Sequence, residues 1–185
     1  KVTSCAIVGL EGALVEVEVD LAGGLPFFAI VGLPDTAVQE SKERVRAAIK
    51  NSGGFFWYHR IAVNLAPADL RKEGPAYDLP IAVGMLIASG QVPAEDKPRL
   101  FLGELSLDGT VRHTNGILPM VALSKEKGIT TVFVPTDDAP EASLIDGLTI
   151  IPVSTLANLM YHLKGEREIP PYKPNFNLNV EEVEP

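Results

Sequence analysis

Apolar and polar residues alternate strictly over residues 13–20. Three valines fall on one side of the implied strand and three acids on the other: Val15, Val17, Val19, Glu16, Glu18 and Asp20. This alternation predicts a β-strand with one buried side and one solvent-facing side. Residues 2–9 form a further apolar run, so we expect the two strands to make a hairpin around Glu11-Gly12.

A helical spacing follows between residues 35 and 52. Asp35 is a good N-cap, and Gly53-Gly54 marks the end of the predicted helix. The buried face would carry Val38, Val45 and Ile49. The exposed face would carry Lys42, Glu43, Arg46 and Lys50. A short apolar strand, Phe27–Val31, is expected before this helix.

Strands and helices alternate in the rest of the chain. We expect strands at 60–65, 100–107, 131–134 and 148–153, and helices at 78–89, 117–127, 139–145 and 154–163. Asp108-Gly109 is a turn signal. The first half resembles an antiparallel meander, and the second half a layered arrangement with some parallel pairing. The predicted fold class is therefore α/β (or α+β), with a mixed sheet and helices packed on it.

The periodic pattern stops near residue 164. Residues 165–185 contain four prolines and an acidic ending: Pro170, Pro171, Pro174, Pro185 and Glu181-Glu182-Val183-Glu184. We expect one domain over residues 1–164 and a linker, or a tail packed along the surface, over 165–185. A linker implies that the natural chain continues.

Composition excludes several classes of protein. A chain of 185 residues, 46% hydrophobic, can bury a core as one domain. No apolar run reaches the roughly 18 residues that span a membrane, and one cysteine, Cys5, fits a reducing cytoplasm. The formal net charge of -8 argues against strong nucleic-acid binding by the chain as a whole.

Few residues have the spacing of a cofactor or metal site. The sequence contains neither a GxxxxGK[ST] loop nor a GxGxxG motif, so we expect no nucleotide site in this chain. His59, His113 and His162 lack paired-ligand spacing, and no metal site is predicted. Cys5, within an apolar strand, is expected to be a buried thiol.

A charged loop joins the strand at 60–65 to the helix at 78–89. It contains Asp69, Arg71, Lys72, Glu73 and Asp78. A catalytic or phosphate-contacting loop and a structural turn with internal ion pairs explain this pattern equally well. The basic residues Lys42, Arg44, Arg46 and Lys50 are interleaved with Glu40 and Glu43, which favours a solvated helix face over a phosphate-binding stripe.

Longer segments resemble a known family. VNLAPADLR, KEGPAYDLP and the segment from Gly103 to Pro135 are similar to the Lon-protease-type domain, a two-layer β-α-β fold of the ribosomal-protein type. With the opening segment, residues 1–164 resemble the N-terminal domain of the ComM/YifB group of bacterial AAA+ ATPases, also described as magnesium-chelatase-like. The resemblance implies that an AAA+ module follows and that this module, not the present chain, uses ATP and magnesium.

The resemblance also implies that the domain is not a protease. Lon-type proteases use a serine after Gly-Pro and a lysine after Gly-Gly-Leu. Alignment of Gly74-Pro75 places Ala76 at the serine position, and alignment of Asn115-Gly116-Ile117 places Leu118 at the lysine position. A methyl group cannot attack a carbonyl and leucine cannot accept a proton, so no catalytic residue is expected.

The family implies a cytoplasmic hexameric ring that moves branched or single-stranded DNA during natural transformation, without membrane contact. This domain would contribute to ring assembly and to DNA contact. The candidate DNA or subunit contacts are Arg71, Lys72, Lys42, Arg44 and Arg46. Two alternatives remain: a magnesium-chelatase-related subunit domain, and an oligomerisation scaffold without nucleic-acid contact.

Overall fold

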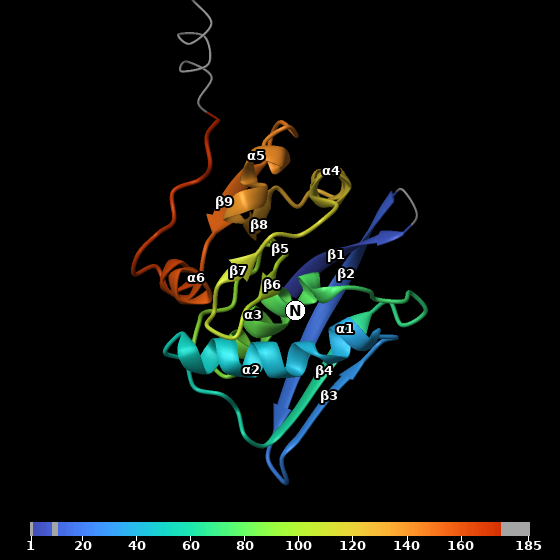
Figure 1. The fold of residues 1–185 in the computed structure, drawn as a ribbon, viewed down its shortest axis with the longest axis vertical. Coiled ribbons are helices and arrows are strands. Elements are labelled where there is room, and N and C mark those ends of the chain that lie inside the picture. The colour runs from blue at the N-terminus through green and yellow to red at the C-terminus, as the bar shows by residue number, and fades with distance from the viewer. Residues whose placement is uncertain (1, 9–10, 175–185) are drawn as a thin grey trace, which may run out of the picture.

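The computed structural model describes residues 2–8 and 11–174 and shows a seven-stranded mixed sheet with helices packed on it (Figure 1). The strands are β1 (Val2–Val8), β2 (Glu11–Ala22), β3 (Phe27–Val31), β4 (Arg60–Ala66), β5 (Leu100–Phe101), β6 (Glu104–Leu105), β7 (Val111–Arg112), β8 (Thr131–Pro135) and β9 (Thr149–Val153). The α-helices are α1 (Thr36–Gln39), α2 (Ser41–Asn51), α3 (Asp78–Ala88), α4 (Ile117–Glu126), α5 (Ala139–Ala142) and α6 (Leu156–Leu163). Two short 3-10 helices are η1 (Pro75–Tyr77) and η2 (Thr136–Asp138). The mixed α/β class predicted from the sequence is confirmed.

The strand order is β3-β4-β2-β1-β5-β8-β9, with β6 and β7 in a separate two-stranded sheet. β2 pairs antiparallel with β1 and β4, while β1, β5, β8 and β9 pair in parallel. The predicted meander is wrong, because β3 pairs in parallel with β4 after a crossover through α1 and α2. The predicted hairpin turn is misplaced, since Glu11 and Gly12 belong to β2 and pair with Val8 and Ile7.

Helices cover the two faces of the sheet unequally. Val15 and Val17 of β2 lie in a large apolar cluster under α2, α3 and α6, while α4 and α5 cover a second cluster on the other face of β5 and β8. Alternate residues of β8 divide between them, with Phe133 in the first cluster and Val132 in the second. The acids of β2 are exposed, as the alternation predicts.

Two predicted elements are each split in two. The helix expected at 35–52 is interrupted at Glu40, although the predicted cap is confirmed: the Asp35 carboxylate accepts from Val38 N at 2.8 Å. The strand expected at 100–107 is interrupted at Gly103, whose N–H donates to Ala76 O at 3.1 Å. A Cβ at Gly103 would lie 2.8 Å from a Val111 methyl, so this close contact favours glycine.

The start of the proline-rich segment lies against the domain. Ile169 N donates to His162 Nδ1 at 2.8 Å, and Tyr172 N donates to Ile150 O of β9 at 2.7 Å. Part of the segment after residue 164 therefore contacts the domain, whereas the acidic ending at 181–184 lies outside the described residues. Of the helices in the described part, none has the length and apolar character to cross a membrane.

Candidate functional site

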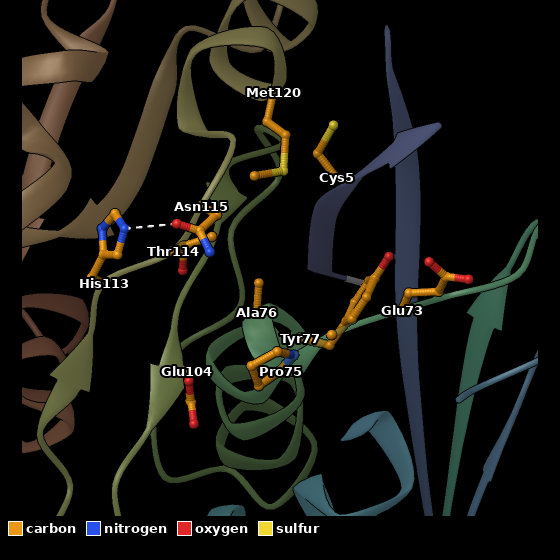
Figure 2. Close-up of a pocket in the computed structure, with 11 residues that line it drawn as sticks. Cys5, Glu73, Pro75, Ala76, Tyr77, Glu104, His113, Thr114, Asn115 and Met120 are labelled. Atoms are coloured by element: carbon orange, nitrogen blue, oxygen red, sulfur yellow. Dashed lines mark hydrogen bonds between the residues drawn. The ribbon is translucent and has the colours of Figure 1, made fainter. Parts of the chain in front are cut away.

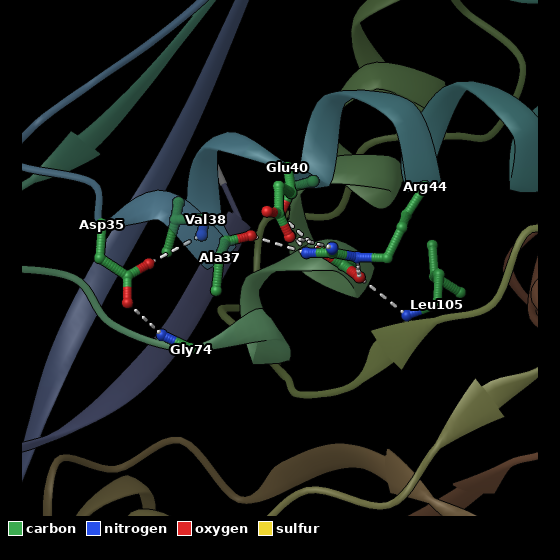
Figure 3. Close-up of polar contacts among 9 residues, drawn as sticks. Asp35, Ala37, Val38, Glu40, Arg44, Gly74 and Leu105 are labelled. Carbon is green, nitrogen blue, oxygen red and sulfur yellow. Dashed lines mark hydrogen bonds and ion pairs between the residues drawn. The ribbon is translucent and has the colours of Figure 1, made fainter.

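The charged loop is fixed to the segment that precedes α1. Lys72 N donates to Leu33 O and Asp35 N donates to Lys72 O, each at 2.9 Å. The second carboxylate oxygen of Asp35 accepts from Gly74 N at 3.1 Å (Figure 3). Gly74 has φ +84°, a conformation that side chains rarely adopt. These contacts hold η1 at the start of α3 in one orientation.

A cavity of about 460 Å³ opens beside η1 (Figure 2). Its walls come from the loop at 73–77, from residues 113–115, and from Cys5, Glu104 and Met120. Three distant parts of the chain therefore meet here: β1, the start of α3, and the segment that leads from β7 into α4. A concave site of this size is where a ligand or substrate would be sought first.

The cavity holds no nucleophile with a base beside it. Ala76 lines the wall as a methyl group, and the half-buried Leu118 is not among the described residues that line it. Cys5 is 2% exposed, and the imidazole of His113 has both nitrogens occupied. Among the described residues, the arrangement therefore lacks the serine–lysine geometry of a Lon-type protease.

His113 forms a carboxylate–imidazole pair at the rim. Its Nδ1 contacts Oδ1 of the buried Asp138, and its Nε2 lies 3.0 Å from Asn115 Oδ1. The other Asp138 oxygen accepts from Thr114 N at 2.8 Å. Acceptance of a hydrogen bond from the imidazole by Asp138, and by Asn115, raises the pKa of His113. No pattern in the sequence indicated this pair, because Asp138 lies 25 positions from His113.

Two buried hydroxyl groups in the cavity wall have no hydrogen-bond partner among the described residues. They belong to Tyr77, 1% exposed, and Thr114, 7% exposed. Burial, followed by smaller effects of Cys5 and nearby acids, raises the pKa of Tyr77, so its hydroxyl stays neutral. Unpaired buried hydroxyls are costly, and water or a polar ligand would satisfy both.

Asp78, at the start of α3, connects this helix with α2 and β6. Its buried carboxylate accepts from Arg44 Nε at 2.6 Å, Ser41 Oγ at 2.5 Å and Leu105 N at 3.0 Å. Burial raises the pKa of Asp78, while Arg44, Ser41 and Leu105 act in the opposite direction. The side chain of Arg44 is 17% exposed and also donates to Ala37 O at 2.7 Å.

The structure separates the five predicted contact residues into two groups. Lys72 and Arg44 both bond to buried parts of the domain, Arg44 to Asp78. Lys72 is fully buried, its Nζ donates to Pro67 O, and burial lowers its pKa. Arg71, 69% exposed, pairs with Glu73 at 3.1 Å. Lys42 is half-buried and Arg46 is 42% exposed on α2. The internal pairs support the structural-turn interpretation of the charged loop.

A second concave surface was not predicted from the sequence. It is a hollow of about 260 Å³ at the start of β3 and β4, and its wall includes Phe27, Phe28, Phe56, Trp57, Tyr58 and Arg46. We call these residues the aromatic hollow. The run Phe55-Phe56-Trp57-Tyr58 was the signal that could have indicated it. No three His, Cys, Asp or Glu side chains within the described ranges gather as a metal site.

Comparison with known proteins agrees with the resemblance seen in the sequence. The family described as "Subunit ChlI of Mg-chelatase" matches residues 17–138. An uncharacterised protein of Mycobacterium tuberculosis is 47% identical over 88% of this chain and 32% of its own length. The competence protein ComM of Haemophilus influenzae is 39% identical over 91% of the chain, and YifB of Escherichia coli is 38% identical over 91%.

A weaker similarity extends to proteases. Lon protease 2 of Bacillus subtilis is 28% identical over 65% of this chain. The chain spans about a third, 32% to 33%, of the length of the M. tuberculosis, ComM and YifB relatives. Because the family match covers more than half of the sequence, the chain belongs to the family of the ChlI subunit of Mg-chelatase, with ComM and YifB among its relatives.

Proposed function

We propose that this chain is a non-catalytic domain of a ComM-like AAA+ ATPase, which contributes to ring assembly and to DNA contact. The ATP and magnesium sites would lie in the remainder of the natural protein. The likeness to a competence protein supports a place in the uptake and recombination of DNA in the cytoplasm. The self-association would be hexameric, as in the family that the sequence resembles.

The observation that carries the non-catalytic assignment is Ala76 in the wall of the cavity. Ala76 lies between Pro75 and the buried Tyr77 in η1, at the position where the resemblance to Lon-type proteases expects the serine, and its methyl group is not reactive. The hydrogen-bond partners of the His113 imidazole are Asp138 and Asn115, and neither of them is a nucleophile that the histidine could activate. The loop therefore supports the fold rather than peptide hydrolysis.

Ring assembly is supported by the charges on opposite faces of the domain. The exposed acids of β2, Glu16, Glu18 and Asp20, lie on the face of the sheet that α2 does not cover. α2 presents Lys42, Arg46 and Lys50 on the other side. A head-to-tail contact between copies would bring these complementary surfaces together, and such contacts close rings.

The DNA contact would use cationic side chains that do not form hydrogen bonds to buried groups of the domain. Of the five candidates, Arg71, Lys42 and Arg46 meet this condition, whereas Arg44 and Lys72 do not. Because the net charge is -8, attraction to DNA must come from a local basic surface and fall steeply as salt concentration rises.

The test compares the natural full-length protein with a version lacking residues 1–164. Mass photometry measures ring formation, and a gel assay with forked DNA measures binding and branch migration. We expect the deletion to reduce both ring stability and DNA affinity. Unchanged rings with unchanged DNA binding would refute the proposal. Loss of rings with intact intrinsic DNA affinity would identify a scaffold instead.

A further inference from the structure

Large aromatic side chains are exposed at one end of the sheet. Phe27, Phe55 and Tyr58 are 50%, 55% and 56% exposed. They lie at the start of β3, an edge strand, and in the loop that leads from α2 into β4 (Figure 1). Exposed aromatic residues gathered at one place usually mark a contact surface.

Three rings at the aromatic hollow, those of Phe27, Tyr58 and Phe56, each have a cation over them. The guanidinium of Arg60 lies 4.9 Å from the ring centre of Phe27, and the ammonium of Lys50 lies 5.3 Å from that of Tyr58. The Arg46 guanidinium lies 5.3 Å from the buried Phe56 ring. Planar apolar surface and positive charge therefore alternate across the same few residues.

Contacts around the hollow hold it in shape and leave the rings of Phe27 and Tyr58 exposed. Trp57 Nε1 donates to Ala22 O at 3.2 Å, and His59 Nδ1 lies 3.1 Å from Gly24 O. Phe28 and Tyr58 both pack against Phe56, with ring centres 5.9 and 5.7 Å away. A surface fixed in advance loses little conformational entropy when a ligand binds.

We propose that the aromatic hollow binds single-stranded nucleic acid, with bases stacked on Phe27 and Tyr58 and phosphates beside Arg60 and Lys50. Stacked bases need ring faces and phosphates need nearby cations, and this surface supplies both. A base can lie flat on an exposed ring while its phosphate lies beside the neighbouring cation, so a single strand matches both features of this surface along its length. The inference rests on the proposed DNA contact and assigns it to residues outside the charged loop.

The test uses the only tryptophan of the sequence, Trp57, which lines the hollow. Oligothymidylate of 15 nucleotides is titrated into the 185-residue chain at low salt. Bound bases should quench the Trp57 emission in parallel with a rise in anisotropy of a labelled oligonucleotide. Phe27→Ala and Tyr58→Ala should each weaken binding about tenfold, within the range measured for base stacking.

Charge and aromatic effects are separated by matched variants. Arg60→Gln should reduce the slope of log K against log salt by about 0.7, the value for one phosphate contact to a single strand. Tyr161→Ala is the control, because Tyr161 is 44% exposed and lies under Arg167 at 5.6 Å, outside the hollow. Circular dichroism checks that all variants remain folded.

Unchanged affinity in the Phe27→Ala/Tyr58→Ala double variant would overturn the inference, as would equal loss in Tyr161→Ala. Self-association of the chain that is lost in the double variant, without quenching by oligothymidylate, would show that the hollow is a protein interface and would also overturn it. A different result would refute the proposed function: deletion of residues 1–164 from the full-length protein would leave ring formation and DNA affinity unchanged.

Discussion

Replacement of Arg44 tests whether a predicted surface contact is in fact structural. Arg44→Ala removes two hydrogen bonds from the Asp78 carboxylate and a third from Ala37 O. It leaves Asp78, which is fully buried, with only Ser41 and Leu105 N as donors. Removal of one partner from a buried ion pair costs about 3–5 kcal/mol of unfolding free energy.

The expected loss lies at the lower end of that range, about 3 kcal/mol, because Arg44 keeps some contact with water. Urea denaturation followed by circular dichroism measures it. With a slope of about 2 kcal/mol per molar urea, the midpoint should fall by about 1.5 M. Lys42→Ala, two positions earlier in α2 and without a contact to Asp78, should change the unfolding free energy by less than about 0.5 kcal/mol.

The loss of stability in Arg44→Ala should depend on pH, and the direction of this dependence follows from the pKa of Asp78. Loss of Arg44 removes effects that lower the pKa of Asp78, so burial raises that pKa further. A raised carboxyl pKa in the folded state gives stability that is present below the ordinary aspartate pKa, about 3.9, and is lost as pH rises through the folded value. The difference from the unmodified chain should therefore be smaller at about pH 4.5 than at pH 7.5. A midpoint shift below about 0.3 M urea at about pH 7.5 would show that Arg44 is not structural.

Two further predictions concern the backbone and the rim of the cavity. Gly32→Ala should destabilise the fold by at least about 2 kcal/mol, because φ is +112° and a Cβ would lie 2.1 Å from Leu65 O; Gly23→Ala, with open space around it, should have little effect. Asp138→Asn should lower the pKa of His113 toward its ordinary value, so that the histidine loses its proton at lower pH in an NMR titration. A His113 titration identical in both proteins would mean that Asp138 does not hold the imidazole.

The sequence predicted those parts of the fold that depend on local patterns. The alternation in β2 correctly identified its buried valines, and Asp35 correctly identified a helix start. The split of the strand at Gly103 was missed, because it depends on a contact with Val111 that is visible only in three dimensions. The parallel pairing of β3 with β4 is likewise a long-range choice.

Charge alone was a poor guide to function within the candidate site. Lys72 and Arg71 are adjacent in sequence, yet one is fully buried and the other exposed. Arg44 and Arg46 differ in the same way, because only Arg44 faces the buried Asp78. The resemblance to a family drew attention to Ala76, which the structure places in the cavity wall. The aromatic hollow was not predicted from the sequence, although four aromatic residues follow one another at 55–58.

The strand order places two surface features at opposite edges of the sheet. β3 and β4 carry the aromatic hollow at one edge of the sheet, and residues 169–172 run beside β9 at the other edge. Six strand spacings of about 4.8 Å separate these edges by about 29 Å. Because hydrogen-bonded strands shift little relative to one another, the sheet keeps these two surfaces at a fixed separation. A partner bound beside β9 would therefore reach the hollow only if it extends across about 29 Å.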